Sequence, residues 1–165
     1  MAALNKYTLL ISDSTTGKVY KPDIRARKYA VTFGDQNMKP APCAPLPNIG
    51  INGIRVTGRY LYYVNTFANT LTRVKVNLEK RLTVEDFHII TTKLSMTDDL
   101  DVINDVEVIA QGSNFSTIAG GVGAALGRTW KDRDIVCMST NGGGLTSPVN
   151  RTFTEEVKAV AILIK

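Results

Sequence analysis

Gly50-Ile51-Asn52-Gly53-Ile54-Arg55-Val56, followed at once by Arg59-Tyr60-Leu61-Tyr62-Tyr63-Val64-Asn65-Thr66, is the stretch that decides the fold. Apolar and polar residues alternate along it, and β-branched and aromatic side chains dominate, which is typical of a half-buried β-strand. The two glycines beside Asn52 let the backbone approach a neighbour or a ligand closely. This stretch therefore predicts β-structure and makes Asn52 the first candidate functional residue.

The same alternation recurs in short runs along the rest of the chain, with turn residues between them. No segment sustains a helical apolar period over three turns between good caps. The sequence therefore predicts an all-β chain, with strands at 7–11, 18–21, 29–33, 54–64, 71–76, 87–92, 106–110, 135–139 and 159–164.

Composition and charge limit the classes to which this protein can belong. The 165 residues suffice for one domain, and two cysteines are too few for a disulfide framework. The net charge is +5, but the 20 basic residues are scattered, and only Arg25, Arg27 and Lys28 cluster tightly. We therefore expect no nucleic-acid partner. No segment nears the ~20 apolar residues of a membrane helix, and no signal peptide is evident. We expect no membrane partner and a cytoplasmic protein, although sequons at Asn114 and Asn150 would be usable after secretion.

Two segments, 13–21 and 65–73, suggest an internal repeat with an offset of 52 positions. Each reads as a strand, a polar turn and a strand with a basic residue near its end. A spacing of roughly 40 to 50 residues is typical of propeller blades, and a long loop such as 37–47, with four of the six prolines, can extend it. The alternative of two unrelated hairpins stays open.

With these residues identified, the chain resembles the superfamily of senescence marker protein, gluconolactonase and luciferin-regenerating enzyme, and most closely its fungal members. Asn52-Gly53-Ile54 with Leu61-Tyr62-Tyr63 is the most specific piece of the match. Supporting pieces span nearly the whole chain in the family's order, at 9–14 with 17–20, 97–100, 126–129 and 133–136. The resemblance implies a β-propeller of four-stranded antiparallel blades.

Members of that family are usually about twice as long, so this chain resembles their C-terminal half. We therefore expect 1–165 to form a single partial propeller domain of about three blades, the third incomplete between Asp99 and Ala119. An unclosed propeller exposes apolar surface on its end blades; about 600 Å² at ~25 cal/mol per Å² would forfeit roughly 15 kcal/mol. Closure by a second copy, a rearranged sheet or a missing companion segment is therefore predicted.

The resemblance also implies a function, a metal-assisted lactone or ester hydrolase acting on a small-molecule substrate, with a site that is degraded here. Asn52 and Asp98 match two of the family's four metal ligands, and their oxygen atoms suit calcium and are tolerated by zinc. Asp98 would also act as general base on the attacking water. The alternatives are a turn role for Asn52 between its two glycines and a solvated acidic turn for Asp98.

Two further residues, Tyr62 and Asn65, follow Asn52 and are predicted to contact the substrate. His88, the only histidine, is predicted to be a surface or packed strand residue rather than a catalytic base. Two other functions stay open. One is a metal-free cyclase of fungal secondary metabolism that uses an apolar cavity lined by tyrosines; the other is a non-enzymatic binding scaffold.

Overall fold

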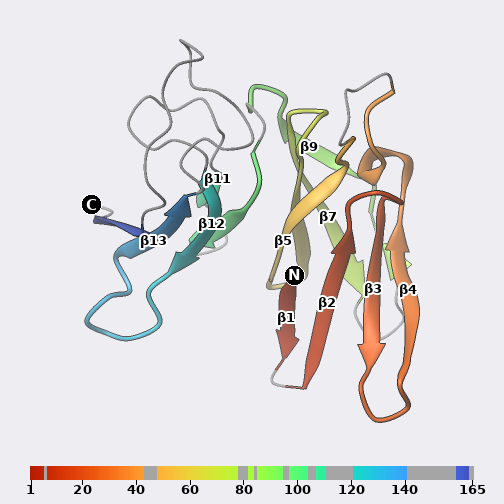
Figure 1. Ribbon diagram of the computed structural model, residues 1–165, viewed down its shortest axis with the longest axis horizontal. Helices are drawn as coiled ribbons and strands as arrows, with labels where there is room; N and C mark the ends of the chain where they lie inside the picture. The colour runs from red at the N-terminus through yellow and green to blue at the C-terminus, as the bar shows by residue number, and fades with distance from the viewer. Residues whose placement is uncertain are drawn as a thin grey trace. The chain divides into compact units, whose positions relative to one another are not determined.

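The structure is a computed structural model, and it describes residues 1–5, 7–42, 48–77, 82–83, 85–94, 97–103, 107–110, 121–140 and 159–163. Apart from one 3-10 turn, η1 (Gln36–Met38), every regular element in these residues is a β-strand (Figure 1). The all-β expectation is therefore confirmed. The chain divides into an N-terminal unit, 1–93, and a C-terminal unit, 94–165.

The first sheet of the N-terminal unit is an antiparallel meander in which each strand pairs with the next along the chain. Its strands are β1 (Ala2–Asn5), β2 (Thr8–Asp13), β3 (Lys18–Asp23) and β4 (Lys28–Gly34). Thr32 forms a bulge in β4, because Val19 lies opposite Phe33 while Tyr20 lies opposite Val31. The bulge lets both Thr32 and Phe33 point to the buried side of the sheet.

The second sheet begins in the alternating stretch 50–66. Its strands are β5 (Ile51–Thr57), β6 (Tyr60–Asn65), β7 (Thr70–Asn77), β8 (Leu82–Thr83) and β9 (His88–Thr91), and both β8 and β9 pair with β7. The expectation of one strand over 54–64 is wrong. Gly58 adopts a φ of +56° and turns the chain, so this run is a hairpin of two strands.

The two segments related by 52 positions occupy equivalent places in the two sheets. The β2–β3 turn and the β6–β7 turn each hold a residue of positive φ at the same offset, Gly17 at +68° and Asn69 at +56°. The side chain at the head of each turn also accepts a backbone N–H, from Thr15 and Thr16 at Asp13 and from Ala68 at Asn65. The repeat is therefore structural, and the reading of two unrelated hairpins is no longer needed.

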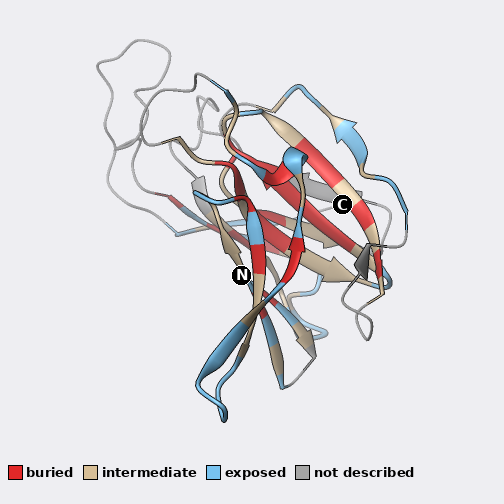
Figure 2. Ribbon diagram, turned by 90° about the vertical axis from the view of Figure 1, so that its right-hand side faces the viewer, coloured by how far each residue is buried: buried red, intermediate tan, exposed pale blue. Residues whose placement is uncertain are grey.

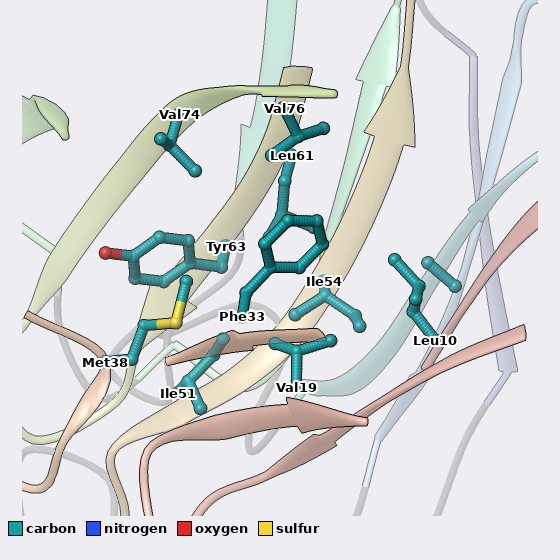
Figure 3. Close-up of a cluster of buried hydrophobic side chains, with 11 residues drawn as sticks. Leu10, Val19, Phe33, Met38, Ile51, Ile54, Leu61, Tyr63, Val74 and Val76 are labelled. Atoms are coloured by element: carbon teal, nitrogen blue, oxygen red, sulfur yellow. The ribbon is translucent and has the colours of Figure 1, made fainter. Parts of the chain in front are cut away.

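One apolar core lies between these two sheets (Figure 3). Leu10, Val19 and Phe33 enter it from the first sheet, and Ile54, Leu61 and Val74 enter it from the second. All six side chains are 3% exposed or less. The period-2 alternation explains this arrangement, because it sends every second side chain of each strand to the shared face.

The C-terminal unit contains a two-stranded sheet, β10 (Leu100–Ile103) with β11 (Glu107–Ala110), and a three-stranded sheet. The strands of the latter are β12 (Gly121–Leu126), β13 (Ile135–Thr140) and β14 (Ala159–Leu163). Two aspartates join the sheets, because Asp99 accepts the N–H of Ala124 at 3.2 Å and Asp101 accepts that of Leu126 at 2.7 Å. Much of the predicted third blade, 104–106 and 111–120, lies outside the described residues.

Candidate functional site

Asn52 lies in a β-bulge near the start of β5. Ile51 pairs with Asn65 and Ile54 pairs with Tyr63, so the residues between them on β5 outnumber those on β6. The backbone carbonyl of Asn52 accepts a hydrogen bond from the Ser12 hydroxyl at 2.7 Å, and its Nδ2 donates to Thr66 Oγ1 at 3.2 Å. These contacts tie β5 to the first sheet and to the end of β6. They support the structural role of Asn52, while its role as a metal ligand stays a prediction.

Asn65, a predicted substrate contact, is 2% exposed at the end of β6. Its Nδ2 donates to the carbonyls of Asn37 (3.1 Å) and Lys39 (2.7 Å), and its Oδ1 accepts the N–H of Ala68 at 3.1 Å. One side chain therefore caps the β6–β7 turn and anchors the segment that leaves η1. Both amide protons and one oxygen lone pair are used within the fold.

Tyr62, the other predicted substrate contact, points away from the core shared by the two sheets, opposite to its neighbours Leu61 and Tyr63. It is 2% exposed, and the ring of Tyr60 lies 6.3 Å away. Tyr62 and Tyr63 therefore face opposite sides of the sheet, so they do not line one cavity.

Two arginines flank Tyr62 on neighbouring strands. Arg55 on β5 and Arg73 on β7 are its register partners, so the three side chains form one row across the sheet. The Arg73 guanidinium also lies over the Tyr60 ring, 5.2 Å from its centroid. Paired guanidiniums beside a phenol suit an anionic group such as a carboxylate. This row was not predicted from the sequence. A hairpin that turns at Gly58 places Arg55 opposite Tyr62, so recognising that turn would have revealed the pair.

Asp98 is half-buried immediately before β10. Its neighbours Asp99 and Asp101 use their carboxylates to bind the backbone of β12, so this acidic segment connects two sheets rather than forming a solvated turn. Asp98 belongs to the C-terminal unit and Asn52 to the N-terminal unit. Their convergence on one site, and the role of Asp98 as general base, stay predictions.

A metal centre needs several donor side chains close together. Nowhere in the described residues do three or more histidine, cysteine, aspartate or glutamate side chains gather closely enough to hold an ion. Asn52 donates an amide N–H to Thr66, and Asp99 and Asp101 accept backbone N–H groups. A calcium or zinc centre at Asn52 and Asp98 stays a prediction. His88 lies exposed on β9, as expected for a strand histidine.

Tyr63 carries a buried hydroxyl that titrates abnormally. It faces Thr72, its register partner on β7, and neither hydroxyl makes a hydrogen bond of normal geometry within the described part of the chain. Burial raises the pKa of Tyr63 above the usual value of 10.0. The folded chain therefore retains this proton at pH values where the unfolded chain has released it.

This burial predicts a loss of stability in alkali. The contribution of Tyr63 to the free energy of unfolding is constant below about pH 10. Above that pH, the free energy of unfolding falls by up to about 1.4 kcal/mol per pH unit. Tyr63→Phe should remove this pH-dependent fall and change stability at neutral pH by less than about 1 kcal/mol, since the hydroxyl has no hydrogen-bond partner in the described structure. Urea unfolding at several pH values measures both effects. The exposed Tyr29→Phe is the control, and an unchanged slope in Tyr63→Phe would contradict the assignment.

Comparisons with known proteins give no relative on which to base a role for these residues. No protein-family model matches the sequence, and no curated protein matches it. The chain is thus placed by its own residues as an all-β protein with two structurally equivalent sheets in its N-terminal unit.

Proposed function

We propose that this protein is a propeller-type binding scaffold rather than a catalyst, and that the first sheet completes its packing against a second copy of the chain. The observation that carries the proposal is the open face of that sheet. A four-stranded sheet, β1–β4, and a five-stranded sheet, β5–β9, each packed through one face, also support the propeller geometry.

The open face is apolar in two adjacent rows. Ile11, Tyr20 and Val31 are register partners across three strands. Leu9 on β2 and Tyr29 on β4 lie two residues before Ile11 and Val31, on the same face of the sheet. Ile11 is 41% exposed, Val31 51% and Tyr29 76%. The Tyr29 ring meets the edge of Tyr20 at 5.4 Å, so the two aromatic side chains support each other. We name these five residues the open-face cluster.

The energetics favour coverage of this cluster. An exposed patch of roughly 400 Å² is of the size that often marks an interaction site on a protein surface. Burying it on two copies removes apolar surface from water, which favours association. The cluster contains no aspartate, glutamate, lysine, arginine or histidine, so its partner needs no opposite charge. Such an apolar β-face can pack against another copy of itself, and stacked sheets lie about 10 Å apart.

A matched pair of substitutions tests the scaffold proposal. Ile11→Lys places a charge in the centre of the open-face cluster and should raise the dimer dissociation constant about 30-fold. Ile90→Lys is the control, because Ile90 is exposed to the same extent, 40% against 41%, but lies on β9. Sedimentation equilibrium measures both. Equal dissociation constants for the two variants would refute the proposed interface.

Hydrolysis of a small lactone or ester is the second candidate function, and the row of Arg55, Tyr62 and Arg73 favours it. Two guanidiniums beside a phenol would hold the carboxylate that such a reaction releases. In this candidate the arginines bind and orient that carboxylate, and the role of Asp98 as general base on water is a separate proposal from the family resemblance. The proposal extends to Asn52 as a ligand for an added divalent ion.

Turnover of small aliphatic lactones by the full chain, with and without added calcium or zinc, tests this candidate. Stoichiometric metal that is lost in Asn52→Ala would support it, together with a rate that falls at least 100-fold in Asp98→Asn. Arg73→Gln should weaken inhibition by the released carboxylate with little change in kcat, since it removes a guanidinium that binds this product. A chain that binds neither metal and turns over no lactone would leave only the scaffold function.

A further inference from the structure

The turns at one end of the first sheet combine exposed apolar and basic side chains. The strands are consecutive and antiparallel, so the β1–β2 turn and the β3–β4 turn lie at the same end. In Figure 1 both turns lie at the lower end of this sheet, and the β3–β4 turn is the lowest loop in Figure 2, where it is coloured as exposed. Tyr7 belongs to the first turn and Ile24 to the second, and they are 82% and 78% exposed.

The β3–β4 turn is the one basic cluster that the sequence shows. Between positions 21 and 28, four basic side chains stand against one acidic side chain, Asp23, which leaves a net charge of +3. Arg25, Arg27 and Lys28 are exposed, and none of them pairs with a carboxylate within the described ranges. The cluster therefore presents its full charge to solvent.

The conformation of this turn is well defined. Asp23 Oδ1 accepts the N–H of Ala26 at 2.9 Å, and the backbone of Asp23 lies opposite that of Lys28 in the strand register at the base of the turn. Arg27 adopts a φ of +50°, which is uncommon for a side chain of its size. These features hold Ile24 at the tip with basic side chains on the residues that follow it. A fixed apolar tip surrounded by cations is thus built into the sheet.

We propose that this end of the first sheet docks on an anionic membrane surface, with Ile24 entering the headgroup region and Arg25, Arg27 and Lys28 binding lipid phosphates and carboxylates. Tyr7, on the β1–β2 turn at the same end of the sheet, is 82% exposed, and tyrosine is enriched at the level of the headgroups. This is attachment to a surface. None of the described helical residues forms a segment long or apolar enough to span a bilayer.

A membrane fits these side chains better than a nucleic acid does. Three cations on one turn are few for a phosphate backbone, and the aliphatic Ile24 at the tip cannot stack on a base. An exposed isoleucine gains from entry into lipid, while each basic side chain near an anionic surface strengthens binding about fivefold. The expectation of no membrane partner rested on the lack of a spanning segment, which does not bear on attachment through one turn.

Co-sedimentation of the full chain with vesicles tests the proposal. Binding is expected to phosphatidylcholine vesicles that contain about one third phosphatidylserine, not to phosphatidylcholine alone, and it should weaken strongly in roughly 0.5 M salt. The triple variant R25Q/R27Q/K28Q should bind about 100-fold more weakly. Ile24→Ser should weaken binding about tenfold without any change in charge.

The control variant is K18Q/K39Q/K93Q, which removes the same charge from exposed positions outside this turn. Lys18 and Lys39 lie at the opposite end of the sheet, because the backbone of Lys39 adjoins Gly17 in the β2–β3 turn. This control should bind vesicles like the parent chain, and circular dichroism should show that every variant is folded. Equal loss in both triple variants, no vesicle binding, or tighter binding to a single-stranded oligonucleotide would each overturn the proposal.

Discussion

Replacing Gly50 with alanine is expected to destabilise the N-terminal unit by about 4 kcal/mol or more. A Cβ at this position would lie 2.5 Å from the carbonyl oxygen of Met38, 2.6 Å from the nitrogen of Pro40 and 2.7 Å from the carbonyl carbon of Lys39. These are backbone atoms, so no side-chain rotation relieves the overlap.

The position of Gly50 makes a local adjustment costly. Its N–H donates to the Ser14 carbonyl at 2.8 Å, and its own carbonyl accepts the N–H of Thr66 at 3.1 Å. Gly50 thereby joins the two equivalent turns of the repeat, since positions 14 and 66 differ by 52. Any shift that makes room for a methyl group would stretch these buried hydrogen bonds.

Urea unfolding followed by circular dichroism measures this effect. Gly34→Ala is the matched control, because a Cβ there meets the Lys18 Cγ at 3.5 Å and the Gly17 carbonyl at 3.8 Å, which are ordinary contacts. The control should change stability by less than about 1 kcal/mol. If Gly50→Ala were as stable as Gly34→Ala, the close contact between Gly50 and the backbone of residues 38–40 would be refuted.

Asn65→Ala is expected to cost about 3 kcal/mol. The substitution removes three hydrogen bonds from a side chain that is 2% exposed. It leaves the carbonyls of Asn37 and Lys39 and the N–H of Ala68 without this partner, and unsatisfied buried groups are more costly than the bonds are favourable. The loss should appear as a lower denaturation midpoint with an unchanged slope against urea.

Asn37→Ala is the control for this prediction. The Asn37 side chain bonds only to the exposed Asp35 at 3.0 Å in the described structure, while its carbonyl, which Asn65 binds, is kept. The control should lose less than about 1 kcal/mol. A fully stable Asn65→Ala that loses ligand binding would instead favour the predicted substrate role over the structural one.

The strand pattern was readable from the sequence because each sheet buries one face. Alternation located β2, β3, β4, β7, β9, β11, β13 and β14 closely. It did not separate β5 from β6, since Gly58 and Arg59 form a turn so short that the alternation resumes at once. β1, β8, β10 and β12 were missed; β8 has only two residues, and β12 is rich in glycine and alanine, which give no clear alternation.

The candidate site was less readable, because its geometry depends on partners remote in sequence. The sequence marks Asn65 as a polar residue at a strand end, but its two acceptor carbonyls lie 28 and 26 positions away. The row of Arg55, Tyr62 and Arg73 depends on the register of two hairpins. The family resemblance directed attention to Asp98 and to Asn52, whose hydrogen bonds join β5 to Ser12 and Thr66.

The mass of the purified chain in solution tests the central claim most directly. If the open-face cluster pairs two copies, sedimentation equilibrium at micromolar concentration should give about twice 18.0 kDa. The same measurement on Ile11→Lys should move toward a single copy. A well-folded parent chain that stays at 18.0 kDa over the whole concentration range would contradict the account.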